Sequence, residues 1–203
     1  AKEMLQNILV FRFTNNLLEK VWTNSEIESI DIKLFETLGV EKRGAFYEKV
    51  GALKDVGQNH ILQLLSLVTM ENPISLEAEK VRVTRSKVLQ FLPDLSEEDI
   101  VKNTKRYQYK GYREIEDVDK SSTVETYFDI NFSLTHPRWK DVKIRARSGK
   151  RMAESRKEIV ITFKHLDNCL CPIDGQHVQN RVIFRFAPEE EIVIEFWSKK
   201  PGY

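Results

Sequence analysis

Apolar residues follow a helical spacing over most of the first ninety positions. Near the start of the chain they recur every four residues, at Leu5, Leu9, Phe13, Leu17 and Val21. This spacing predicts a helix over residues 3–22, because positions four apart lie on one face of a helix. Similar patterns predict a long helix over residues 45–70, a third over residues 76–91 and a short one over residues 97–103.

Strand patterns dominate the rest of the chain, with one early exception. Residues 30–36 alternate apolar and polar side chains, which is typical of a strand with one buried face. Later segments rich in Val, Ile, Phe and Thr predict strands at residues 123–134, 142–147, 158–164, 180–186 and 191–198. Helices first and strands later indicate an α+β fold, with a large, mostly antiparallel sheet and helices packed on one face.

Length and charge limit the classes of protein to which this chain can belong. With 203 residues, of which 41% are apolar, the chain can bury one core, so we expect a single domain over residues 1–203. A net charge of +1 provides no field that would attract nucleic acid or an anionic membrane. No apolar run approaches the roughly 20 residues that span a bilayer, and the first residues lack the form of a secretory signal. We therefore expect a cytoplasmic protein that binds neither nucleic acid nor membrane.

The two cysteines, Cys169 and Cys171, are spaced C-x-C in a polar loop. No second cluster of Cys or His at zinc spacing accompanies them. We expect both cysteines to be reduced, and we expect no metal site.

A carboxylate, a glycine and a histidine interrupt the long helix, in the segment KDVGQNH (residues 54–60). At about 100° per residue, His60 lies at the edge of the apolar stripe and points toward packed structure. His60 is therefore either a core histidine bonded to a carbonyl or a general base. Asp55 lies roughly 140° away and is either a solvated carboxylate or an acceptor for a ligand along the helix. Gly57 costs up to about 1 kcal/mol in a helix, so we expect it to let a neighbouring element approach closely.

Positive charge is concentrated between residues 140 and 157, a segment that contains eight Lys and Arg residues but only two acidic residues. Arg145 and Arg147 fall on one face of a predicted strand, and a turn through Gly149 and Lys150 follows. One interpretation is a strand edge that is protected from aggregation by its charge. The other is a site for a small anionic ligand such as a phosphate or carboxylate.

Six short segments match motifs that occur together in one known family. Residues 2–7 (KEMLQN) are similar to the end of R-I-D-H-Y-L-G-K-E and its continuation, and residues 11–15 (FRFTN) to L-R-F-A-N. Residues 40–47 (VEKRGAFY), 55–60 (DVGQNH), 147–151 (RSGKR) and 199–202 (KKPG) are similar to G-x-E-G-R-G-G-Y-F, R-D-x-x-Q-N-H, R-x-G-K and K-x-P-G. Over nearly its whole length the chain resembles the C-terminal β+α domain of glucose-6-phosphate dehydrogenase.

The resemblance implies an activity and a set of site residues. The parent enzyme would oxidise glucose 6-phosphate to 6-phosphogluconolactone with NADP, in the pentose phosphate pathway. His60 would be the base that takes the proton of the anomeric hydroxyl. Glucose 6-phosphate would also contact Lys2, Glu36, Asp55 and Lys150, with Lys2 near its phosphate. The family further implies a homodimer formed through the sheet.

A second, structural nucleotide site occurs in some relatives. The nearest candidates for it in this chain are Arg147, Arg156 and Arg185. The main NADP site would belong to an N-terminal domain, because no glycine-rich strand-turn-helix occurs in this sequence.

Four departures from the family pattern separate two hypotheses. The chain opens inside a helix at the motif's lysine, and it lacks the nucleotide fold, so we expect a fragment that is inactive alone. At the position of a second basic substrate residue stands Ser155, and Phe186-Ala187-Pro188 replaces V-Q-P or L-Q-P. These two changes favour the alternative, a divergent non-catalytic module that binds a sugar phosphate or forms dimers.

Overall fold

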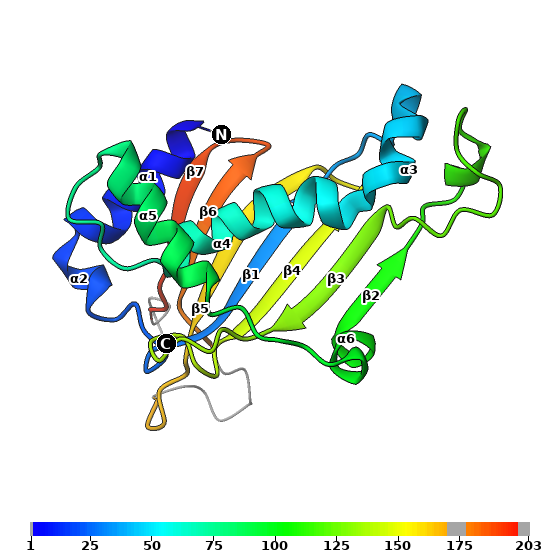
Figure 1. Ribbon diagram of the computed structural model, residues 1–203. Coiled ribbons are helices and arrows are strands. Elements are labelled where there is room, and N and C mark those ends of the chain that lie inside the picture. Colours follow the sequence, from blue (N-terminus) through cyan, green and yellow to red (C-terminus); the bar gives the residue numbers. More distant parts are fainter. Residues whose placement is uncertain (1, 170–177, 199–203) are drawn as a thin grey trace.

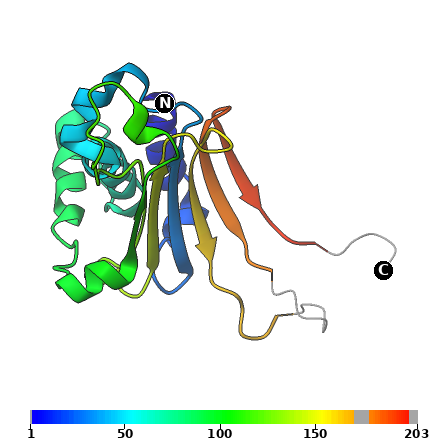
Figure 2. The ribbon, with the colours of Figure 1, turned by 90° about the vertical axis from the view of Figure 1, so that its right-hand side faces the viewer.

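The computed structural model describes residues 2–169 and 178–198, which form a sheet layer and a helix layer (Figures 1 and 2). The helices are α1 (Lys2–Thr14), α2 (Asn16–Glu19), α3 (Gly44–Ala52), the π-helical segment η2 (Leu53–Ile61), α4 (Leu62–Thr69), α5 (Ala78–Leu89) and α6 (Glu97–Asn103). Two 3₁₀ turns are η1 (Glu41–Arg43) and η3 (Tyr112–Glu114).

A seven-stranded sheet forms the other layer, in the order β2-β3-β4-β1-β5-β6-β7. The strands are β1 (Ile27–Phe35), β2 (Thr104–Tyr107), β3 (Tyr127–Phe132), β4 (Lys143–Gly149), β5 (Arg156–Phe163), β6 (Arg181–Ala187) and β7 (Glu191–Glu195). In the described residues β1 and β4 pair in parallel and every other neighbouring pair is antiparallel. The predicted α+β fold with a mostly antiparallel sheet is confirmed.

The helices cover one face of the sheet and leave the other face open (Figure 2). Alternation along the strands separates the two faces: Ile30 and Ile32 of β1 are fully buried against the helices, whereas Asp31 points to the open side. Ion pairs connect neighbouring strands on the open face, including Arg145 Nη2 with Asp129 Oδ2 at 2.6 Å.

The basic segment forms β4 and β5, and neither is an edge strand. Both strands pair on both sides, so the interpretation of residues 140–157 as a protected sheet edge is wrong. Their charges divide between the two faces of the sheet. Arg145 and Arg147 lie on the open face, as the alternation predicted, and Lys150 and Lys157 lie on the helix side.

One helix and one strand differ from the sequence prediction. The helix predicted over residues 3–22 breaks at Asn15, whose backbone is extended (φ −97°, ψ 107°) and whose side chain donates to the Phe11 carbonyl at 2.9 Å. Asn side chains compete with helical backbone hydrogen bonds in this way. The sequence analysis missed β2, because this four-residue edge strand is mostly exposed and has no apolar alternation.

The long helix predicted over residues 45–70 is three pieces. Gly51, near the end of α3, adopts the non-helical angles φ 64° and ψ 179°, and this kink precedes the start of η2. This start is capped by Glu125, whose carboxylate accepts from the Leu53 N–H at 2.9 Å. Phe46 of α3 is 48% exposed.

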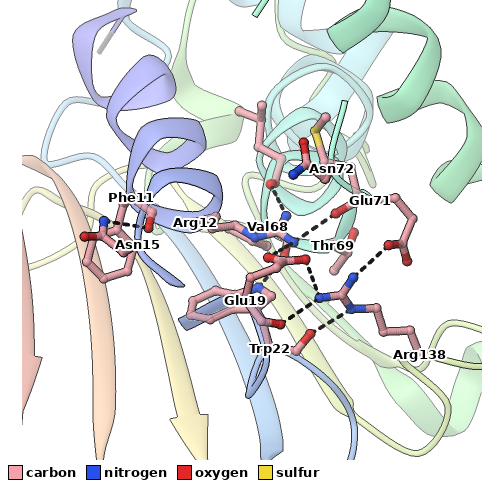
Figure 3. Close-up of polar contacts among 12 residues, drawn as sticks. Phe11, Arg12, Asn15, Glu19, Trp22, Val68, Thr69, Glu71, Asn72 and Arg138 are labelled. Carbon is pink, nitrogen blue, oxygen red and sulfur yellow. Dashed lines mark hydrogen bonds and ion pairs between the residues drawn. The ribbon is translucent and has the colours of Figure 1, made fainter. Parts of the chain in front are cut away.

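The C-terminus of α4 is fixed by side chains from distant parts of the chain (Figure 3). Trp22 Nε1 donates to the Val68 carbonyl at 2.7 Å, and Trp139 Nε1 donates to the Thr69 carbonyl at 2.7 Å. The buried Arg12 donates to the carbonyls of Leu67 and Met70 at 2.8 and 2.9 Å. These bonds satisfy carbonyls that a helix end leaves without partners, so α4 and the adjoining η2 are held at a fixed place over the sheet.

Two expectations near the C-terminus have different outcomes. Cys169 is disulfide-bonded, so the expectation that it is reduced is wrong; a cysteine count does not determine the redox state. Cys171 and the K-x-P-G motif lie outside the described residues.

Among the helices of the described ranges, none combines the length and apolar character needed to cross a bilayer.

Candidate functional site

A cleft of about 420 Å³ lies between η2 and one end of the central strands. Its polar lining consists of Glu36, Arg43, Asp55, His60, Gln63, Ser148, Lys150 and Lys157, and its apolar lining of Leu5, Leu34, Val56, Leu64 and Phe186. Four of the five residues predicted for catalysis and substrate binding therefore meet in one cavity: Glu36, Asp55, His60 and Lys150.

The helix wall of the cleft carries Asp55 and His60 on the same side. The predicted separation of roughly 140° assumes an α-helix, and η2 is π-helical. A π-helix bonds residue i to residue i+5, so residues five apart lie nearly above one another. The π-helix thus corrects the prediction: both side chains line the cleft.

His60 is exposed, and the interpretation of it as a core histidine is wrong. A ring at the surface of a cleft reaches both ligand and solvent, which a base needs in order to accept and release a proton. Gly57, three residues earlier, is buried and explains how η2 approaches the sheet. A Cβ there would lie 3.1 Å from the ring of Phe128 on β3, which confirms that this glycine permits a close approach.

The sheet wall of the cleft is built by the ends of three neighbouring strands. Strands β1 and β4 are parallel, and Phe35 pairs with Gly149 at their C-terminal ends. The next residues, Glu36 and Lys150, therefore lie side by side at the same end of the sheet. The antiparallel strand β5 begins at this end of the sheet, where Lys157 pairs with Leu34 of β1. Sequence positions more than 100 apart are thereby brought into contact.

Glu36 lies between two lysines. Lys157 Nζ donates to Glu36 Oε1 at 2.7 Å, and Lys150 Nζ donates to Glu36 Oε2. Burial raises the pKa of Glu36, but the hydrogen bonds and charges of the two lysines outweigh burial and lower the pKa to about 2. Glu36 is therefore a carboxylate at neutral pH and serves as a hydrogen-bond acceptor, not as an acid.

The cleft therefore has two chemically different walls. The sheet wall holds one carboxylate and two ammonium groups, which suits an anionic ligand. The helix wall holds a carboxylate and an imidazole, which suit hydroxyl groups and proton transfer. Arg43 lies at the cleft on η1 and forms no ion pair with any residue that the structure describes.

Several predicted residues are placed outside this cluster. Lys2 begins α1, and its side chain lies outside the described part, although Leu5 of the same helix lines the cleft. Ser155 is exposed and does not line the cleft. Phe186 does line it, and its neighbour Ala187 stands at the position where the family pattern has glutamine.

The three arginines proposed for a second nucleotide site lie on the open face, away from the cleft. Arg147 pairs with Asp31, Arg156 with Glu154 at 3.0 Å, and Arg185 with Glu191. Arg185 also approaches Glu158 at 3.5 Å. A nucleotide phosphate there would have to compete with these carboxylates.

The sequence analysis missed Lys157 as a cleft residue. It belongs to none of the six motifs, and it lies two positions from the place where the resemblance expects a basic residue. Only one signal could have identified it: in the strand that begins near residue 156, Lys157 has the same parity as the apolar residues Ile159 and Ile161, so it shares their face.

Comparison with known proteins shows similarity over the whole chain. Residues 9–203 match the family model described as glucose-6-phosphate dehydrogenase, C-terminal domain. Glucose-6-phosphate 1-dehydrogenase of Borreliella burgdorferi is 39% identical over the full chain, which covers 45% of that relative; the Chlamydia trachomatis protein is 36% identical, with 48% covered. The chain thus spans less than half the length of these relatives.

Solved structures show the same similarity. Glucose-6-phosphate 1-dehydrogenase from Mycobacterium avium matches 97% of the chain with a TM-score of 0.88 and 31% identity, and 44% of that structure is covered. A glucose-6-phosphate dehydrogenase in complex with its substrate glucose-6-phosphate matches 98% of the chain with a TM-score of 0.86 and 33% identity, and 42% of it is covered.

Proposed function

The chain belongs to the glucose-6-phosphate dehydrogenase C-terminal domain family, and from this we propose that it forms the substrate-binding part of an NADP-dependent glucose-6-phosphate dehydrogenase. The observation that carries the proposal is the meeting of Glu36, Asp55, His60 and Lys150 in one cleft. These residues come from three separate stretches of the chain, and burial in the core does not account for the place of His60 among them, since it is exposed. The reaction is the oxidation of glucose 6-phosphate to 6-phosphogluconolactone.

His60 acts as the general base. Its imidazole takes the proton of the anomeric hydroxyl, and the electron pair left on oxygen forms the lactone carbonyl as a hydride leaves the anomeric carbon. When bound, NADP⁺ would supply the acceptor for that hydride. The proton on His60 then passes to solvent, which the exposed position of the ring allows.

The remaining cleft residues bind and orient the sugar. Asp55, on the same side of η2 as His60, accepts hydrogen bonds from sugar hydroxyls. Glu36 does the same from the sheet wall, because two lysines keep it ionised. Lys150 and Lys2 contribute positive charge, Lys2 near the phosphate. Such a set discriminates between sugars by hydroxyl position, since an unpaired polar group in a binding site is costly.

The wider proposal concerns assembly, cofactor and location. A single domain over residues 1–203 binds substrate and pairs with a second copy through the open face of the sheet. NADP binds mainly to a separate coenzyme domain, so the 203-residue chain alone is inactive. A structural nucleotide site at Arg147, Arg156 and Arg185 belongs to the same proposal, as do a cytoplasmic location and a role in the pentose phosphate pathway.

Turnover by the complete protein tests this function. We expect reduction of NADP on addition of glucose 6-phosphate by the complete protein, and none by the 203-residue chain. Replacing His60 with Asn should lower kcat by about 10²–10⁴-fold with little change in KM, because a base acts in the transition state.

The matched control is His136→Asn. His136 lies outside the cleft and its Nδ1 accepts from the Arg138 N–H at 3.1 Å, a bond that an asparagine oxygen can also accept, so activity should persist. Full activity of the His60 variant would refute the role of base. A complete protein that binds glucose 6-phosphate without oxidising it would favour the non-catalytic module, which the changes at Ser155 and Ala187 suggest.

A further inference from the structure

Lys157 lines the cleft, and the function proposed above gives it no contact with the substrate, only a part in keeping Glu36 ionised. Its side chain is 36% exposed, whereas that of Lys150 is 10% exposed. Both ammonium groups bond to the same carboxylate, Lys157 to Oε1 and Lys150 to Oε2 of Glu36. Lys150 is therefore the inner member of the group and Lys157 the member that faces open space.

The donors of these lysines exceed what Glu36 can use. An ammonium group has three N–H donors, and the described residues accept one from each lysine. Two donors remain on Lys157, at a group that is partly open to solvent. One carboxylate against two ammonium groups also leaves a net positive charge at the sheet wall, so the unused donors suit an anionic oxygen.

The strand pairing around Lys157 fixes where it points. It sits opposite Leu34 of β1 on one side and Ala187 of β6 on the other. The register of β5 against β6 shifts between Lys157 and Glu158, which leaves Phe186 as the extra residue. Such bulges redirect side chains next to functional sites, and here Lys157 and Phe186 both line the cleft.

A sugar phosphate matches the two walls of the cleft in polarity. Its phosphate is a dianion, and its other polar groups are neutral hydroxyls. The proton-accepting group of the cleft, His60, lies on the helix wall, and in the sugar the anomeric hydroxyl on C1 and the phosphate on C6 are separate groups, several bonds apart. With His60 at the anomeric hydroxyl, the positive sheet wall suits the phosphate, alongside Lys2 of α1.

We propose that Lys157 binds the phosphate group of the substrate, and that Glu36 and Lys150 act as positioning residues that hold its ammonium group in place. This inference rests on the proposed function, because it takes the ligand to be a sugar phosphate. It assigns specificity for the phosphate to a residue outside every motif of the chain.

Binding measurements on the 203-residue chain test the assignment. Glucose 6-phosphate, inorganic phosphate and glucose are titrated by calorimetry, with nuclear magnetic resonance for the weak ligands. Replacing Lys157 with Gln should weaken the binding of glucose 6-phosphate and of inorganic phosphate by about ten- to a hundred-fold, the usual range for a hydrogen bond to a charged group. Binding of glucose should change less than about three-fold.

Lys33→Gln is the matched control. Lys33 also donates to one glutamate, Glu158, at 2.9 Å, but it lies on the open face of the sheet, so this variant should bind all three ligands as the parent does. Lys157→Arg keeps the charge and should retain most of the affinity for phosphate. Circular dichroism establishes that each variant is folded.

Three results would overturn the proposal in distinguishable ways. Unchanged phosphate binding by Lys157→Gln would refute the role of Lys157 alone. An equal loss for glucose and for glucose 6-phosphate would place Lys157 at a sugar hydroxyl instead. A parent chain that binds inorganic phosphate but does not prefer glucose 6-phosphate over it would refute the sugar-phosphate function itself.

Discussion

At the scale of single residues, the site depends on charges that stabilise one another. Glu36 is half-buried, and a carboxylate in that position would favour protonation if no cation were near. Lys150 and Lys157 reverse this preference and bring its pKa to about 2. The same contacts hold the two lysines in place, so the charge state of one residue organises the sheet wall of the cleft.

This arrangement predicts an acid-dependent contribution to stability. A carboxylate whose pKa falls on folding stabilises the native state above its unfolded pKa, and that contribution is lost as the pH falls toward the folded pKa. For Glu36 the window runs from about 4.5 down to about 2. The difference in Tm between the parent chain and Glu36→Gln should be constant above pH 5 and should shrink as the pH falls through this window.

Glu98→Gln is the control for this experiment. Glu98 is exposed on α6 and forms no ion pair or hydrogen bond with the described residues, so its replacement should leave Tm nearly unchanged at every pH. A difference for Glu36→Gln that stays constant down to pH 2 would show that its lysine contacts do not depress its pKa. Scanning calorimetry between pH 2 and 8 provides the measurement.

At the scale of elements, the site depends on the break between α3 and η2. Gly51 has a backbone conformation that is essentially restricted to glycine, and a Cβ there would lie 2.6 Å from Glu125 Oε1. Glu125 in turn caps the start of η2. This glycine therefore sets the direction of the helix that carries Asp55 and His60.

Replacing Gly51 with Ala should be strongly destabilising. Backbone strain alone should lower the free energy of unfolding by about 1–3 kcal/mol, and displacement of Glu125 adds to it. Gly111→Ala is the matched control: Gly111 also has positive φ (90°), but the nearest atoms to its Cβ position are 3.7 Å away, so the cost should be limited to the backbone strain of about 1–2 kcal/mol. Urea unfolding followed by circular dichroism measures both, and equal losses would contradict the role given to Glu125.

At the scale of the whole molecule, the helices lie on one side and the sheet is open on the other (Figure 2). Besides its ion pairs, the open face carries an apolar row across β5, β6 and β7, formed by Val160, Ile183 and Val193 in register. Apolar side chains between charged strands suit a surface that packs against another protein surface. This supports the proposed pairing with a second copy.

A charge in this row should prevent the pairing. In light scattering, the parent chain should have twice its own mass of 23.8 kDa, and Val160→Asp should have the mass of one chain. The control, Val101→Asp, places the same charge on α6 at a valine that is 80% exposed, and it should remain a dimer. A Val160→Asp variant that is folded by circular dichroism and still dimeric would exclude this face as the interface.

The sequence by itself determined most of the elements and the chemistry available to the site. Period-four and period-two patterns gave the correct type for the main helices and strands, because burial of one face imposes these periods on the sequence. Asp55, His60 and Lys150 were also open to prediction, since they belong to local motifs, and Glu36 followed from the family resemblance. The redox state of Cys169 and the weakly patterned β2 were not.

Only the tertiary structure decided how these residues meet. The π-helix turned Asp55 and His60 to one side, and Gly57 lets this helix pack closely against Phe128 of a distant strand. The parallel pairing of β1 with β4 brought Glu36 to Lys150, and β5 added Lys157. Periodicity reports which face of an element is buried, but strand order and helix type depend on contacts between segments far apart in the chain. For that reason the members of the site could be read from the sequence, and its two-walled geometry could not.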